Sequence, residues 1–129
     1  MTRPARRILS ARAGSALAEF ALIAPVLLLL LFGTIEAGRA LWLQNALHFA
    51  VQAAARCASI NTTTCSSLGT IQSYAASVSG AQFDASVFSW SGTTSCGNQV
   101  SASYPMSLYI PYVGATVTLT AQACFPKSS

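Results

Sequence analysis

One apolar stretch limits what this chain can fold into more than any other feature. Between Ala16 and Ile35 the only charged residue is Glu19, and most of the others are leucine, isoleucine, phenylalanine or alanine. Twenty residues of helix span about 30 Å, which is the thickness of the hydrocarbon core of a bilayer. The stretch is therefore predicted to cross a membrane. A carboxylate inside such a segment costs on the order of 3 kcal/mol unless it is paired, so Glu19 is a candidate functional residue.

Composition and charge constrain the rest of the chain. Of its 129 residues 53% are hydrophobic and 8% are charged, and outside the apolar stretch only one small domain can be built. The net charge of +4 comes from the four arginines that precede Gly14, because the three basic and three acidic side chains from Ser15 onward cancel. A cationic leader is typical of a cytoplasmic flank. This leader is expected to lack regular structure, and nucleic-acid binding is not expected because no basic patch follows it.

The residues at the start of the apolar stretch resemble a known processing site. Gly14 and the following S-A-L-A-E-F are similar to the cleavage motif of type IV prepilins. The continuation from Phe32 to Arg39 resembles the TadE-like pseudopilins of the tight-adherence (Flp) pilus systems. The resemblance implies that a membrane-bound prepilin peptidase cuts between Gly14 and Ser15, on the cytoplasmic side.

The same resemblance gives Glu19 and Phe20 a role in assembly. Cleavage leaves an amino group on Ser15, about 6 Å along the helix from Glu19. In the family this glutamate pairs with the amino terminus of a neighbouring subunit, which neutralises the carboxylate and sets the axial register. The alternative is that Glu19 lies at the cytoplasmic interface and interacts only with the helix dipole.

The implied protein is a minor pilin or pseudopilin. The resemblance places it in the bacterial inner membrane as a single-pass protein, with its N-terminus in the cytoplasm and its head in the periplasm, and then in the extracellular pilus after assembly. The implied partners are the inner membrane, the prepilin peptidase, other pilin or pseudopilin subunits and the pilus assembly platform.

Beyond the apolar stretch the helix is predicted to continue to about Ala58. Pro25 predicts a kink, and the spacing of Glu36 and Arg39 predicts an exposed ion pair at the outer interface, followed by Trp42. The next turns are amphipathic. The apolar face comprises Leu43, Leu47, Ala50, Ala54 and Cys57, and the polar face Asn45, His48, Gln52 and Arg56.

The rest of the chain predicts a small head. Leu68–Ser79 carries apolar residues at helical spacing, and Gly80 ends this helix. Alternation with a period of two then predicts three strands. These strands are expected over 83–88, 100–110 and 116–123. A polar loop is expected over Ser91–Asn98, and Pro105 indicates an edge strand or a bulge.

All four cysteines follow the apolar stretch, which suggests disulfides in an exported head. Three pairings are possible, and the shortest loops favour Cys57–Cys65 and Cys96–Cys124. A zinc site is less favoured because there is no C-x-x-C. The predicted fold class is α+β: a long N-terminal transmembrane and stalk helix with a small disulfide-linked head of one short helix and an antiparallel sheet of about three strands. The predicted domains are a leader (1–14), a transmembrane and amphipathic stalk (15–58) and a periplasmic head (59–129).

Catalytic chemistry is not expected. His48 is the only histidine, Asp84 is the only acid after Glu36, and no serine lies in a nucleophile motif. No catalytic residue, metal ligand or cofactor is predicted. Two other functions stay open. One is a membrane-anchored periplasmic binding module that does not polymerise, with Trp90 and Tyr109 as contact residues. The other is a secreted protein whose signal is removed after the apolar run.

Overall fold

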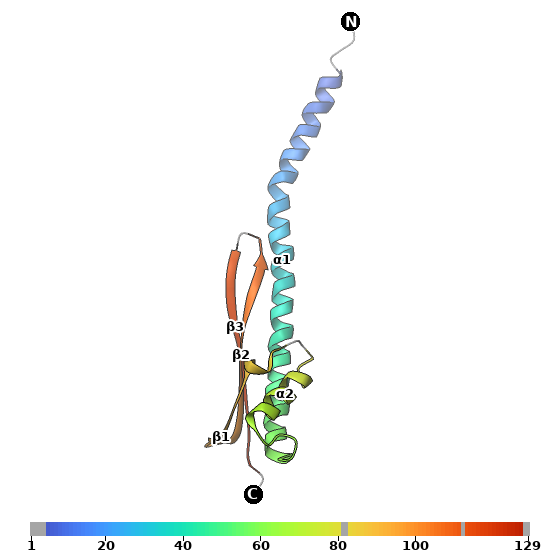
Figure 1. Ribbon diagram of the computed structural model, residues 1–129. Helices are drawn as coiled ribbons and strands as arrows, with labels where there is room; N and C mark the ends of the chain where they lie inside the picture. Colours follow the sequence, from blue (N-terminus) through green and yellow to red (C-terminus); the bar gives the residue numbers. More distant parts are fainter. Residues whose placement is uncertain (1–4, 81–82, 112, 128–129) are drawn as a thin grey trace.

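One helix runs along most of the length of the molecule, and a small head packs against its C-terminal half (Figure 1). The computed structural model describes residues 5–80, 83–111 and 113–127. The elements are helix α1 (Ala5–Ile60), helix α2 (Leu68–Val78), a 3-10 turn η1 (Ala85–Val87), and strands β1 (Phe88–Thr94), β2 (Gly97–Ile110) and β3 (Val113–Phe125). This architecture, with two disulfides in the head, confirms the predicted α+β fold class.

Helix α1 begins earlier than the sequence predicts. The leader is expected to lack regular structure, but α1 starts at Ala5 and passes through Gly14 without a break. The alanine, arginine and leucine residues of this region all have high helix propensity, and one glycine costs only about 1 kcal/mol. Pro25 lies inside α1. Figure 1 shows the helix bent in its N-terminal half, as expected where proline removes a backbone hydrogen bond.

The three strands form one antiparallel sheet in the order β1-β2-β3. β2 and β3 pair up to the end of their hairpin, where Ile110 lies opposite Val113. β1 is shorter and pairs with β2 only as far as Ala102. Pro105 therefore lies on a part of β2 where β3 is the only pairing strand within the described residues. That is an edge position, where a missing N–H donor is tolerated.

The first strand is a prediction that the structure corrects. A strand is expected over Phe83–Phe88, but η1 occupies its centre. β1 begins at Phe88 and extends into the expected polar loop as far as Thr94. Asp84 is the reason, because its carboxylate accepts a hydrogen bond from the Ser86 backbone N–H and caps the turn. The same bond lowers the pKa of the Asp84 carboxyl. The turn into β2 is short because Gly97 adopts a φ of 113°.

Helix α2 follows its local sequence signals closely. The Ser67 side chain and the Thr70 side chain form a reciprocal capping box at its start. The helix ends at Val78, with Ser79 as its C-cap and Gly80 at a φ of 64°. These signals set the two ends of α2. The helix packs against α1, and Gln72 Nε2 also donates a hydrogen bond to the Phe88 carbonyl at the start of β1.

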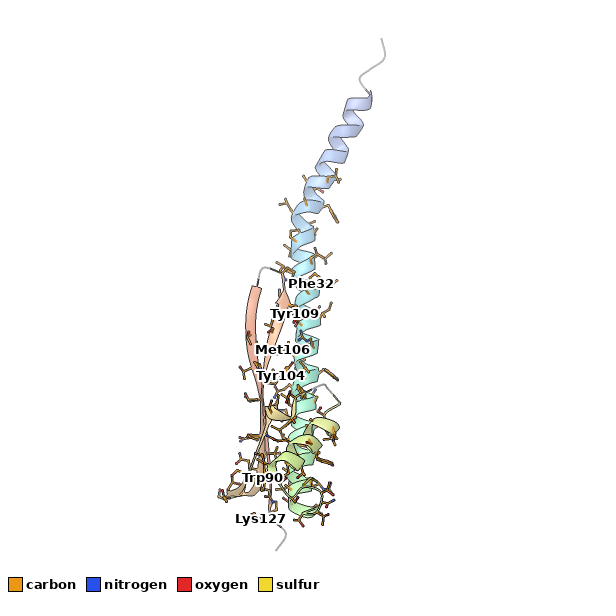
Figure 2. The ribbon with its side chains drawn as sticks, in the orientation of Figure 1. Phe32, Trp90, Tyr104, Met106, Tyr109 and Lys127 are labelled. Atoms are coloured by element: carbon orange, nitrogen blue, oxygen red, sulfur yellow. A yellow bond between two sulfur atoms is a disulfide. The ribbon has the colours of Figure 1, made fainter. Side chains whose placement is uncertain are left out.

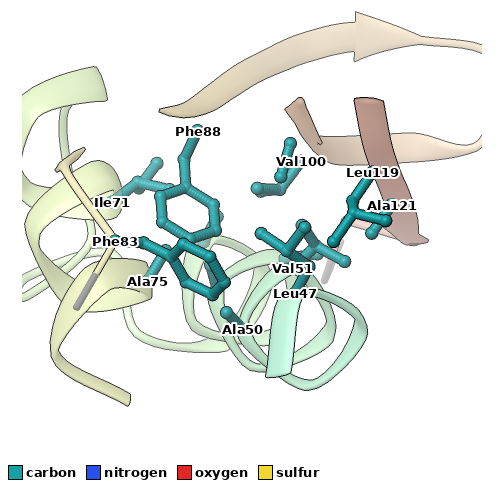
Figure 3. Packing of buried hydrophobic residues seen from close by; sticks show 14 of the residues in the cluster. Leu47, Ala50, Val51, Ile71, Ala75, Phe83, Phe88, Val100, Leu119 and Ala121 are labelled. Carbon is teal, nitrogen blue, oxygen red and sulfur yellow. The ribbon is translucent and has the colours of Figure 1, made fainter. Parts of the chain in front are cut away.

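The core lies between α1, α2 and one face of the sheet (Figure 3). Its largest fully buried side chains are Phe88, Leu47, Ile71, Met106, Val51 and Val100. On α1 the predicted apolar face is buried at Leu43, Leu47, Ala50 and Ala54, whereas Asn45, His48, Gln52 and Arg56 are exposed. Each fully buried side chain of this size contributes about 1.5–3 kcal/mol. The head therefore depends on its packing against α1.

Two disulfides cross-link the head. Cys57–Cys65 joins the last turns of α1 to the segment before α2, and Cys96–Cys124 joins the β1–β2 turn to the end of β3. These are the pairs that the short-loop argument favours. All four cysteines are used in these bonds.

Candidate membrane and assembly segment

The N-terminal half of α1 exposes apolar side chains around its whole circumference. From Leu17 to Leu31 the large hydrophobic side chains are 41% to 76% exposed. Figure 1 shows this part of α1 extending beyond the head. Among the described residues, one helix is long and apolar enough to cross a membrane, and it is this one. An apolar surface of this extent is not left in water, so the helix suggests single-pass membrane anchoring.

The residues of the predicted processing and assembly motif lie in neighbouring turns of α1. Gly14, Ser15, Glu19 and Phe20 are all exposed, Phe20 to 69%. Ser15 and Glu19 are four residues apart, so they lie on one helix face with an axial separation of about 6 Å. A Cβ at Gly14 would meet no atom within 4 Å. Packing within the described structure therefore gives no reason for a glycine there.

Glu19 has no cationic partner among the side chains that the structure describes. Within residues 14–80, 83–111 and 114–127, the one ion pair joins Arg39 to Glu36. Glu19 is exposed and is surrounded along the helix by apolar residues. In a bilayer such a carboxylate is costly until a cation pairs with it. Among the described side chains, none neutralises the Glu19 carboxylate in such an environment.

Glu36 lies in a different environment from the one predicted. The spacing predicts an exposed pair with Arg39, but Glu36 is only 7% exposed. Arg39 Nη1 donates to the two carboxylate oxygens at 3.1 and 3.3 Å. The same nitrogen donates to the Ser107 carbonyl at 3.4 Å, and the Arg39 guanidinium lies 5.2 Å from the centre of the Tyr109 ring. The β2–β3 hairpin therefore packs over the ion pair.

The residues proposed for an alternative binding function do not come together. Trp90 is half-buried, and its Nε1 donates to Asn98 Oδ1 at 3.3 Å. Tyr109 is 71% exposed and lies toward the other end of the sheet, as Figure 2 shows. His48 is exposed, with its Nε2 3.0 Å from Gln44 Nε2. The structure thus gives Trp90 and Tyr109 no shared surface.

A groove beside α1 is a feature that the sequence does not reveal. Its volume is about 600 Å³, and Phe49 and Ile60 of α1, Tyr74 of α2 and Phe125 of β3 are among its lining residues. Arg56 is the one charged side chain in the lining. The groove therefore has no pair of groups for acid–base chemistry. Its sequence signal is the presence of Phe49 and Ile60 close to Gln52 and Arg56 of the predicted polar face.

The helix that carries these side chains is similar to a known family. Residues 14–56 match the family of TadE-like proteins. This match confirms the predicted resemblance to TadE-like proteins over that segment. The TadE-like segment, residues 14–56, begins at the glycine of the predicted cleavage motif and contains Glu19 and the Glu36–Arg39 pair. No curated protein and no solved structure matches the chain.

Proposed function

We propose that this protein is a minor pilin or pseudopilin of a tight-adherence (Flp-type) pilus assembly system. It is held in the bacterial inner membrane by α1, with its leader in the cytoplasm and its head in the periplasm. A prepilin peptidase cuts between Gly14 and Ser15, and the subunit then joins other pilin subunits at the assembly platform and enters the pilus. Its role is structural and not catalytic.

The observation that carries this proposal is the environment of Glu19. Its carboxylate lies on an exposed, apolar part of α1 and has no cationic partner among the described side chains. Cleavage after Gly14 leaves one new amino group per subunit, on Ser15 at the start of the remaining helix. Pairing this amino group with Glu19 of a neighbouring subunit removes the cost of the unpaired carboxylate. Because the pair has defined geometry, it also sets the register between the two helices.

Two features of Gly14 support the processing step. The TadE-like segment begins at this residue. In addition, a side chain at this position would meet no neighbouring atom within 4 Å, so packing does not account for the glycine. A requirement imposed by a peptidase accounts for it, since the peptidase must bind the backbone on either side of the scissile bond.

Replacement of Glu19 by alanine tests the assembly role. Membrane insertion is expected to be unchanged, because removal of a charge from an apolar helix does not oppose insertion. Incorporation into pili is expected to fall by at least about tenfold, which corresponds to the loss of an interaction of about 1.4 kcal/mol. The measurement is the ratio of this subunit in sheared pili to that in the membrane fraction, in cells that assemble the pilus.

Two control variants separate the charge from the helix surface. Glu19→Asp keeps a carboxylate and is expected to retain part of the incorporation. Leu22→Ala removes an apolar side chain that is 76% exposed on the same helix and is expected to have a smaller effect than Glu19→Ala. Incorporation of Glu19→Ala at the level of the unmodified protein contradicts the assembly role.

A further inference from the structure

The β2–β3 hairpin reaches past the rest of the head, toward the apolar end of α1 (Figure 2). β2 loses β1 as a partner beyond Ala102 and continues, paired with β3, to Ile110. The contact between Arg39 and the Ser107 carbonyl places Ser107 beside Arg39 of α1. From Ser107 to Ile110 the strand advances about 10 Å, which equals about seven residues of helix. The end of the hairpin therefore lies near the level of Phe32, as Figure 2 shows.

The level of Phe32 belongs to the membrane-spanning part of α1. The uncharged residues between Glu19 and Glu36 form about 24 Å of helix, which is less than the roughly 30 Å of a bilayer's hydrocarbon core. A core centred on these residues reaches to Glu36 or slightly beyond it. Phe32 lies four residues, or about 6 Å, inside that boundary. The end of the hairpin consequently overlaps the outer edge of the hydrocarbon core.

The composition of the hairpin suits this position. No aspartate, glutamate, lysine or arginine occurs between Ala85 and Pro126. Tyr109 is 71% exposed, and tyrosine is enriched at membrane interfaces. The nearby charges of Glu36 and Arg39 pair with each other. Transfer of the hairpin end to the interface therefore moves no unpaired charge out of water.

The backbone limits how deeply the hairpin can enter. β2 and β3 form backbone hydrogen bonds with each other along the hairpin. β1 does not pair with β2 in this region, so no described strand covers the other edge of β2. Unpaired backbone groups are not tolerated in lipid-exposed positions deep in the hydrocarbon. A shallow position near the headgroups, where water is present, is compatible with such an edge.

We propose that the end of the β2–β3 hairpin, which comprises Leu108–Pro111 and Gly114–Ala115, inserts into the outer interface of the membrane that α1 spans. The partner of this surface is lipid, and the contact fixes how the head is oriented against the bilayer. The exposed Trp42 on α1 lies about 9 Å beyond Glu36, within the headgroup region of the same interface. The proposal rests on α1 being the membrane anchor and requires neither cleavage nor pilus assembly.

Depth-dependent fluorescence quenching tests the proposal. The full chain carries Tyr109→Trp as its only tryptophan, in a background with Trp42→Phe and Trp90→Phe, and is placed at low density in phosphatidylcholine vesicles. The lipids are brominated either near the glycerol end or near the middle of the acyl chain. Tyr109→Trp is expected to lose most of its emission with the shallow label and less with the deep label. Emission that neither label changes overturns the proposal.

Two reference positions separate this proposal from the membrane anchoring on which it rests. Leu28→Trp in the same background reports on α1 and is expected to be quenched most by the deep label. Trp90, kept as the only tryptophan, is expected to be unaffected by either label. If Leu28→Trp is not quenched, anchoring and hairpin insertion both fail. If Leu28→Trp is quenched and Tyr109→Trp is not, hairpin insertion alone fails.

A second probe and a dilution series complete the test. Gly114 lies opposite Tyr109 in the sheet, and a Cβ there would meet no atom within 4 Å. Gly114→Trp is therefore expected to fold and to give the same shallow quenching, even if Tyr109→Trp disturbs the hairpin. If the emission of either probe shifts only as the protein-to-lipid ratio rises, a second copy of the chain covers the hairpin end and the lipid proposal is wrong.

Discussion

At the scale of single residues, the Glu36–Arg39 pair connects the stalk to the head. The Glu36 side chain is 9% exposed and that of Arg39 is 35% exposed, and Arg39 also contacts Ser107 and Tyr109 of β2. Removal of the arginine leaves a buried carboxylate without its counter-ion. Arg39→Met is therefore expected to lower the free energy of unfolding of the head by about 1–3 kcal/mol. Urea unfolding in detergent, followed by near-ultraviolet circular dichroism, measures this loss.

Two comparisons make the Arg39 prediction specific. Arg56 is exposed and forms no ion pair within the described residues, so Arg56→Met is expected to change stability by less than about 0.5 kcal/mol. The double variant Glu36→Met, Arg39→Met removes both charges and is expected to recover much of the loss. Equal losses for Arg39→Met and Arg56→Met rule out a role for the pair in holding the hairpin.

At the scale of secondary structure elements, the sequence predicts what local signals specify. The amphipathic stalk, α2 and the strands of the β2–β3 hairpin each follow from periodicity over many residues. The sequence predicts the first strand at the wrong residues. The Ser86 backbone N–H donates to the Asp84 carboxylate, and this capping bond makes the first part of the alternating run a 3-10 turn, η1. Nothing in the spacing of Glu36 and Arg39 shows that a strand almost 70 residues later covers them.

The two disulfides are expected to differ in their contribution to stability. Cys57–Cys65 closes a sequence separation of 8 residues, whereas Cys96–Cys124 closes one of 28. In the loop-entropy description the bonds contribute about 2.6 and about 3.6 kcal/mol, respectively. Replacement of Cys96 and Cys124 by alanine is therefore expected to lower the urea midpoint more than replacement of Cys57 and Cys65.

The same unfolding assay in detergent measures both double variants beside the unmodified protein. The Cys96–Cys124 bond also ties the β1–β2 turn to the end of β3, so its loss frees one end of the sheet. A larger loss for the Cys57 and Cys65 variant contradicts the loop-entropy argument for this head.

At the scale of the whole molecule, charge is separated along the length of the chain. The arginines of the leader lie at one end of the sequence, and the segment from Ala85 to Pro126, which contains the sheet, has no charged residue. The membrane segment lies between the leader and the head, with Glu19 near its start and the buried Glu36 near its other end. This order predicts an orientation with the leader in the cytoplasm. The motif from Gly14 to Phe20 can be recognised in the sequence because its residues lie within one short segment. The proposed partner of Glu19 belongs to another chain, so this sequence pattern does not identify it.

The measurement that tests the central proposal most directly is the N-terminal residue and mass of the protein recovered from cells. Processing by a prepilin peptidase predicts a chain that begins at Ser15, and the unprocessed chain in cells that lack the peptidase. An intact Met1 in cells that contain the active peptidase contradicts the pilin proposal and favours an anchored binding module. A chain that begins beyond Phe32 contradicts it as well, because the membrane helix is then removed as an ordinary secretion signal.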